Sequence, residues 1–329
     1  MQIKQARTAM SHPAFTGLSR QHLGALVSEL APRWEARCES GRHDRRGRAR
    51  QREAGAGPKY GLVFTDRLLV TLVHLRTGLT HEALGVIYEV GSSTIGRAIG
   101  EIRRLLAGRG FTVSDRPGVR LRTLADVFAY AQAEDVTLRI DGMETQVRRP
   151  QAGRPGRRAF VSGERKQNTI KTITISDHQG RTLWSGALRP GRMHDQTAMR
   201  TEGVAEQLRL HPAVNAEADD GYRGLAGEFP TQVSAPPRKP KNMNDGPMTE
   251  WYSWREHTRR QSSRRICVEH ANAEHRQSRP LQRYTGRRET YCETHQAIAA
   301  LVSDRAAQRP TRPMTSTELV PVPVSTTVC

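Results

Sequence analysis

The sequence predicts an α/β (α+β) fold, with a helical domain in the amino-terminal part and a second domain built on a mixed sheet. Two observations carry this prediction. Between Phe64 and Ala107 apolar residues recur at three- and four-residue spacing, which is the period of a helix. After residue 130 the pattern changes to short runs rich in β-branched residues, TLRID, TIKTITIS and TLWSGAL, separated by turn sequences such as DHQG. A chain of 329 residues is long enough for two domains.

The first element is a short amphipathic stretch, LSRQHLGALVSEL, and a basic segment follows it. Residues 37–59 hold eight basic and three acidic side chains and almost nothing apolar. This composition predicts a flexible arm. Two interpretations of it stay open, a tether that binds phosphate and a solvated linker.

Residues 60–110 form the predicted helical domain. The helix DRLLVTLVHLRT ends at Gly78, Thr80 caps HEALGVIY, and Ser92 caps SSTIGRAIGEIRRLLA after a break at 89–91. Helix, short turn and helix is the helix-turn-helix arrangement, whose second helix enters the major groove of DNA. A plain three-helix bundle would give the same pattern. The exposed face of the last helix is predicted to carry Ser93, Thr94, Arg97 and Arg103.

The overall charge favours a polyanionic partner. Fifty-two Lys and Arg against thirty-three Asp and Glu give a net charge of +19, and this field attracts nucleic acid. The basic residues cluster, with seven in 148–166 and ten arginines in 255–288. Clustering favours phosphate contacts over a surface that is basic only for solubility.

Cysteine usage and hydropathy exclude several classes of protein. The four cysteines contain no CxxC pair, so neither a zinc ribbon nor a disulfide framework is predicted. No apolar run is long enough to cross a membrane, and the amino terminus has no signal peptide. We therefore expect a soluble, cytoplasmic, nucleoid-associated protein with no membrane partner.

Two acidic residues follow predicted buried strands. Asp141 comes directly after TLRI and before Gly142, and Asp219 follows the apolar stretch 214–218. A turn-capping role would explain either one alone. Because side chains alternate along a strand, only one of Asp219 and Asp220 can face inwards, and we prefer Asp219. Carboxylates aimed at one point suit a pair of divalent cations that catalyse phosphoryl transfer.

A third candidate acid lies on a long predicted helix, from Met248 to about Arg279. Arg265, Glu269 and Arg276 are spaced by four and seven residues, so they share one helix face. This suits a metal ligand placed beside DNA phosphates, although an ordinary Arg–Glu pair within the helix has the same spacing. Two acids at predicted strand ends, Asp141 and Asp219, and one on a later helix, Glu269, are together predicted to form one site.

The motifs of residues 60–304 resemble those of DDE-type insertion-sequence transposases, in the group akin to Harbinger-type transposases. The resemblance rests on DRLLVTLVHLRTGLTHEALGVIY, IDGME, FVSGERKQNTIKT, GRMHDQT, ADDGYRGL and SSRRICVEHANAEHR. The D-G pair, the A-D-x-G-Y motif and the R-x3-E-x6-K/R helix map onto Asp141, Asp219 and Glu269. Ser262 stands where many transposases have Tyr, and Asp220 takes a place often held by a basic or small residue.

The resemblance implies a ribonuclease-H-like catalytic domain over residues 131–305 that depends on Mg²⁺ or Mn²⁺, two ions per active site. It implies cleavage at element ends and strand transfer, with Asp141, Asp219 and Glu269 as catalytic residues and metal ligands. Asp195 is a secondary metal candidate, or caps the helix that begins near Gln196. The partners are double-stranded DNA, both terminal inverted repeats and target, bound by at least a homodimer, with Ser93, Thr94, Arg97, Arg265 and Arg276 as DNA-binding residues.

Two other functions stay open, and so do the outer segments. A non-catalytic or inactive helix-turn-helix repressor would use only residues 60–110, and a ribonuclease-H-like nuclease would cut without strand transfer. Residues 1–59 are assigned to an amino-terminal helix and basic arm, and residues 306–329, rich in Thr, Pro and Val, to a disordered tail.

Overall fold

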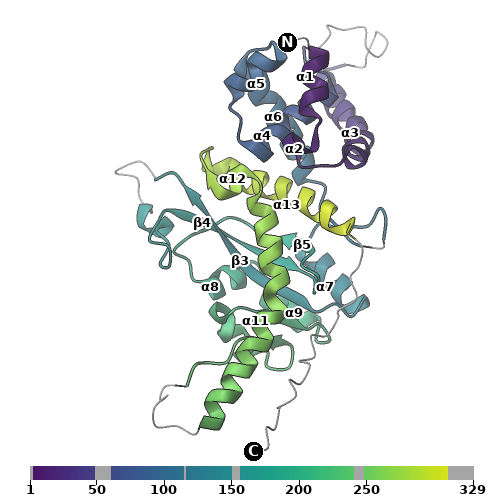
Figure 1. Cartoon of the computed structure of the whole chain (residues 1–329). Coiled ribbons are helices and arrows are strands. Elements are labelled where there is room, and N and C mark those ends of the chain that lie inside the picture. The colour runs from purple at the N-terminus through teal and green to yellow at the C-terminus, as the bar shows by residue number, and fades with distance from the viewer. Residues whose placement is uncertain (1–2, 49–60, 115, 150–155, 241–247, 310–329) are drawn as a thin grey trace, which may run out of the picture.

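A computed structural model describes residues 3–48, 61–114, 116–149, 156–240 and 248–309. Helices gather at one end of the molecule and a sheet with helices on both faces makes up the rest (Figure 1). This confirms the predicted fold class. The helices are α1 (Ile3–Met10), α2 (Pro13–Thr16), α3 (Arg20–Arg46), α4 (Phe64–Thr77), α5 (His81–Tyr88), α6 (Ser92–Ala107), α7 (Leu124–Ala133), α8 (Asp195–Thr201), α9 (Val204–Leu210), α10 (Arg223–Glu228), α11 (Met248–Arg276), α12 (Arg279–Gln282) and α13 (Tyr291–Ala307).

The central sheet is mixed and is built around one long strand, β3. Its main order is β5-β4-β3-β7-β8, in which β3, β4 and β5 are antiparallel and β7 and β8 are added in parallel. Outside this order, β6 pairs with β4 in antiparallel and β9 pairs with β3 in parallel. The strands are β1 (Phe111–Thr112), β2 (Arg120–Leu121), β3 (Leu138–Val147), β4 (Thr169–Ser176), β5 (Thr182–Ser185), β6 (Arg189–Pro190), β7 (Ala216–Ala218), β8 (Val233–Ser234) and β9 (Arg283–Tyr284).

The three helices predicted between residues 64 and 107 are confirmed. α4 ends at Gly78, which adopts the left-handed conformation with φ 75°, and the Thr80 hydroxyl accepts the amide of Ala83 at the start of α5. The predicted cap by Ser92 is wrong, because Ser92 is the first residue of α6 and Gly91 is the N-cap, with no side-chain hydrogen bond. The apolar side chains of α4, α5 and α6 form one core.

The predicted flexible arm is wrong for residues 37–46, which continue α3 as a helix. Leu26, Leu30 and Trp34 anchor the first part of α3 in the core. Within the exposed part, Glu39 pairs with both Arg42 and Arg46, so ion pairs along the helix replace apolar anchoring. The rest of the predicted arm, 49–60, lies outside the described residues, as does the predicted tail from residue 310.

α13 joins the helical part to the sheet. It packs against α6 on one side and against β1 and β5 on the other, and in Figure 1 it lies between the two parts. Its Asp304 accepts hydrogen bonds from His22 of α3 and from Arg109. None of the described helices is long and apolar enough to span a membrane.

Candidate active site

Strand register places Asp141 beside Asp219. In the parallel pair of β3 and β7, Ile140 lies opposite Ala218. Asp141 is the next residue of β3, and Asp219 directly follows the end of β7. Neighbouring strands lie about 4.8 Å apart, so the two carboxylates leave the sheet side by side. Asp141 is buried, whereas the Asp219 side chain is 52% exposed.

The expectation that Asp141 ends its strand is wrong. β3 continues for six residues beyond it, because β4 pairs with β3 through Gln146 and Gly142 does not interrupt the ladder. What ends here is the parallel neighbour, β7, at Ala218. Asp141 therefore lies beside the end of β7 and not at the end of its own strand.

One guanidinium group bridges the two acids. Arg265 Nη2 lies 3.3 Å from Asp141 Oδ1, and Arg265 Nη1 lies 2.5 Å from Asp219 Oδ1. Asn272 Nδ2 donates to Asp141 Oδ2 at 2.6 Å. Arg265 and Asn272 are two helical turns apart, so one face of α11 lies against Asp141 and reaches Asp219. Figure 1 shows α11 crossing the sheet.

The surroundings of Asp141 oppose its negative charge. Burial raises the pKa of Asp141 above its ordinary value, and the nearby charge of Asp219 acts in the same direction. The charge of Arg265, the hydrogen bond from Asn272 and the amide of Gly142 act against the rise. A positive charge beside Asp141 and Asp219, such as the guanidinium of Arg265, stabilises the ionised form of both carboxylates.

The structure brings Asp219 to this point and not Asp220. Asp220 is 61% exposed and pairs with Arg223, three residues ahead. The Asp219 carboxylate accepts the amide of Asp220 and so begins the 3-10 turn Asp220–Tyr222.

Glu269 lies on the same helix but is not joined to the two acids. It is exposed, and within the described chain it forms no ion pair or hydrogen bond through its side chain. It follows Arg265 by one turn and precedes Asn272 by slightly less than one, so it stands at the border of the face that touches Asp141. The alternative explanation of this spacing, an Arg265–Glu269 pair within the helix, is wrong, because Arg265 pairs with Asp141 and Asp219. Arg276 is exposed at the end of α11.

Asp195 lies on the other face of β3. A Cβ atom added to Gly142, whose side-chain direction is opposite to that of Asp141, would come within 3.3 Å of Asp195 Oδ1, and one added to Gly221 would come within 2.9 Å of Oδ2. Lys171 Nζ lies 2.5 Å from Asp195 Oδ1 and 3.4 Å from Glu144. Asp195 therefore packs against the backbone of Gly142 and Gly221, which lie close in sequence to Asp141 and Asp219.

The helix-capping alternative for Asp195 is wrong. α8 begins at Asp195, and the N-cap is His194, whose ring nitrogen accepts the amide of Gln196.

Three residues at this point were missed by sequence reasoning, Asn272, Lys171 and Tyr222. The Tyr222 hydroxyl is buried near Gly142, with no hydrogen-bond partner among the described residues. Burial raises its pKa, as do the charges of Asp195, Asp141 and Asp219. The seven-residue spacing from Arg265 could have identified Asn272. No local signal identifies Lys171, which reaches Asp195 through tertiary packing.

The predicted DNA-reading helix has its amino-terminal half open to solvent. Ser93 and Arg97 are exposed and Thr94 is partly exposed. Ile95 and Ile99, on the opposite side of α6, are buried in the core of the helical part. The prediction is wrong for Arg103, the fourth residue of that face. Arg103 is 15% exposed and pairs with Glu293 of α13, because that side of α6 packs on α13.

The acids beside the end of β7, Asp141 and Asp219, fit a divalent cation. Asp141 and Asp219 already share one positive group, and carboxylate oxygen is the ligand that Mg²⁺ prefers. Among the described residues, however, no three His, Cys, Asp or Glu side chains stand together as a metal site. Of the three acids predicted as ligands, the structure brings Asp141 and Asp219 together and leaves Glu269 apart from them.

Two family models match this chain. Residues 60–112 match the family described as helix-turn-helix of DDE superfamily endonuclease, and residues 140–303 match DDE superfamily endonuclease. A search of curated proteins found no match.

Two solved structures were also found. The crystal structure of the Mos1 strand transfer complex is 14% identical, with a TM-score of 0.17, over 83% of this chain and 98% of that one. The crystal structure of a pre-cleavage Mos1 transpososome is 12% identical, with a TM-score of 0.18, over 93% and 97%. The family matches span both the helix-turn-helix and the acid site, and by them this chain belongs to the DDE superfamily of endonucleases.

Proposed function

We propose that this chain is a DNA transposase that binds the ends of its element, cuts them and joins them to target DNA. The observation that carries the proposal is the meeting of Asp141 and Asp219 at one guanidinium group, beside a helix that carries Glu269. Phosphoryl transfer needs acids held at one point, and the register of β3 and β7 supplies two of them.

The residues divide into those that hold the reaction centre and those that hold DNA. Asp141, Asp219 and Glu269 would bind Mg²⁺ or Mn²⁺, two ions per site, which activate the attacking oxygen and stabilise the leaving one. Asn272 fixes the buried carboxylate of Asp141. Arg265 supplies a positive charge where the phosphodiester must lie, and Arg276 continues that charge along α11.

DNA recognition is assigned to the helix-turn-helix. Ser93, Thr94 and Arg97 stand on the exposed amino-terminal half of α6, the part that reaches base edges in this motif. Two element ends must be held together for joining, so the active assembly is at least a homodimer on DNA.

Product analysis tests the proposal. The intact protein is incubated with Mg²⁺ and a labelled duplex that carries an element end, together with a supercoiled target plasmid. Cut ends and joined products are expected, and both should disappear without the metal. Cut ends without joining would indicate a nuclease, and sequence-specific binding without cutting would indicate a repressor.

A further inference from the structure

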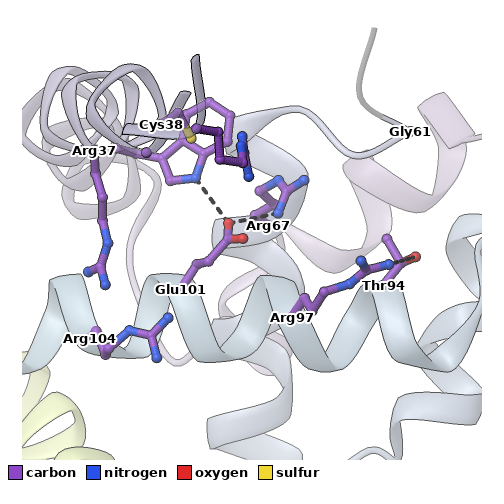
Figure 2. A pocket seen from close by; sticks show the side chains of 11 residues that line it. Arg37, Cys38, Gly61, Arg67, Thr94, Arg97, Glu101 and Arg104 are labelled. Carbon is purple, nitrogen blue, oxygen red and sulfur yellow. Dashed lines mark hydrogen bonds and ion pairs between the residues drawn. The ribbon is translucent and has the colours of Figure 1, made fainter. Parts of the chain in front are cut away.

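A groove of about 530 Å³ lies between the second half of α3 and α6 (Figure 2). Four exposed arginines line it, Arg37 and Arg45 from α3 and Arg97 and Arg104 from α6. Figure 2 shows Arg37 and Arg104 on facing walls. None of the four forms an ion pair with a described residue. Helix α3 therefore adds positive charge to the surface beside the reading helix.

The acid that lines this groove is already engaged. Glu101 accepts hydrogen bonds from Trp34 Nε1 at 3.2 Å and from Arg67 Nη1 at 2.8 Å. Arg67 is almost fully buried, so its charge offsets that of Glu101 inside the wall. The four exposed arginines determine the charge that a ligand would meet.

The groove continues the DNA-reading face of α6. Thr94, Arg97, Glu101 and Arg104 are spaced by three, four and three residues, so they form one stripe along the helix. The amino-terminal end of the stripe is the part assigned to base edges, and Arg104 stands two to three turns further on. A duplex seated at Thr94 and Arg97 would extend its backbone along this stripe.

We propose that the groove between α3 and α6 binds the sugar–phosphate backbone of DNA, through Arg37, Arg45 and Arg104. The inference rests on the proposed function, because it needs DNA at α6. Guanidinium groups bind phosphate oxygens with paired hydrogen bonds, and such contacts set affinity and register without reading sequence. Helix α3 is thus a second DNA-contacting element, separate from the helix-turn-helix.

Salt titration of DNA binding tests the groove with the full-length chain. Anisotropy is measured from 50 to 200 mM salt on an element-end duplex and on an unrelated duplex of equal length. Each of Arg37→Gln, Arg45→Gln and Arg104→Gln should make the negative slope of log K against log salt shallower by about 0.9, on both duplexes alike. Over that range the affinity of each variant should therefore fall about 3.5-fold less than that of the intact protein.

The matched control is Arg20→Gln. Arg20 is exposed at the first turn of α3 and lies about 25 Å along the helix from Arg37. The Arg20→Gln substitution removes the same charge as each groove variant and should leave the slope of log K against log salt unchanged. An unchanged slope in the three groove variants, with binding retained by the intact protein, overturns the inference. Failure of the intact protein to bind either duplex would instead refute the proposed function.

Cys38 provides a second measurement, because it is partly buried in the groove wall. In a chain with Cys267, Cys292 and Cys329 replaced by Ser, bound duplex should slow the alkylation of Cys38 by a maleimide. Binding that leaves Cys38 equally reactive would contradict the proposal. Protection by an acidic peptide but not by DNA would assign the groove to a protein partner.

Discussion

Asp141 and Asp219 each follow the last registered pair, Ile140 and Ala218, of two parallel strands. The pair of acids is therefore created by register and not by a flexible loop. A one-residue slip of β3 would turn Asp141 to the opposite face, where Asp195 and Lys171 lie. The long antiparallel ladder between β3 and β4 holds this register on the other side of β3.

The two neighbouring acids after β7 should differ sharply in their effects. Asp219→Asn should abolish metal-dependent DNA cutting, because its carboxylate faces the same guanidinium as Asp141. Asp220→Asn removes only an exposed pair with Arg223 and should keep cutting within about twofold. Both variants are assayed for cutting and for DNA binding, which should survive in each. Full cutting by Asp219→Asn would refute the assignment.

Gly142→Ala tests whether the packing of Tyr222 and Asp195 against Gly142 positions the neighbouring Asp141. A Cβ atom there would come within 3.0 Å of the Tyr222 hydroxyl and 3.3 Å of Asp195 Oδ1. Gly142→Ala should move the backbone beside Asp141 and lower the cutting rate on the order of a hundredfold, since misplaced reacting groups cost about that much. DNA affinity should not change. The cutting rate is measured under single-turnover conditions.

Gly227→Ala is the matched control for Gly142→Ala. Gly227 lies in α10, and a Cβ atom there meets nothing within 4 Å. Its cutting rate should equal that of the intact protein. Equal rates in both alanine variants would show that the packing of Tyr222 and Asp195 against Gly142 does not position the acid site.

The helical pattern was predictable because its signals are local. Thr80 caps α5 and Gly78 ends α4, and both depend only on neighbouring backbone. The order of apolar runs likewise predicted β3, β4, β5 and β7. The length of β3 was not predictable, because its residues beyond Asp141 pair with β4 and β9, which are distant in sequence.

The candidate site was predictable only in part for the same reason. Strand ends and helix spacing indicated Asp141, Asp219 and Arg265. The partners of Arg265 were not predictable, because the two carboxylates that it contacts come near it only in the tertiary fold. Arg103 was misjudged because α13, nearly 200 residues later, covers that side of α6.

The ion-pair network at Asp304 should contribute strongly to stability. Burial raises the pKa of Asp304, but His22, Arg109 and Arg120 outweigh burial, so the pKa lies well below its ordinary value. Asp304→Asn leaves buried cations without their partner and should lower the free energy of unfolding by about 3–5 kcal/mol. Urea denaturation at pH 7 measures the change. Glu256→Gln, which breaks an exposed pair with Arg260 on α11, should cost less than about 1 kcal/mol.

The sign of the pH dependence follows from the lowered pKa of Asp304. The unfolded carboxyl, with a pKa near 3.9, binds its proton first as the pH falls. The stability from Asp304 is fully present above about pH 4 and is lost as the pH falls towards the folded pKa. In Asp304→Asn this loss should be absent, so the intact and variant proteins should converge in stability below pH 4. A constant difference in stability down to pH 2 would contradict the network.

A second pH dependence, at higher pH, comes from two stacked histidines. The rings of His275 and His295 lie 5.9 Å apart and nearly parallel, and both are buried. Burial lowers the pKa of His275 to about 4 and that of His295 to about 3. In the unfolded chain both have a pKa near 6.5. From pH 6.5 down to about 4 the unfolded state therefore binds up to two more protons than the folded state.

This difference makes acid destabilise the protein well before its carboxylates titrate. Each histidine should lower the free energy of unfolding by about 1.4 kcal/mol per pH unit below pH 6.5. Urea midpoints at pH 7, 6 and 5 measure the slope, and His275→Gln should remove about half of the part due to this pair. His270→Gln, at an exposed position on the same helix, is the control and should keep the full slope. An identical slope in His275→Gln and the intact protein would show that the pair is not held neutral in the core.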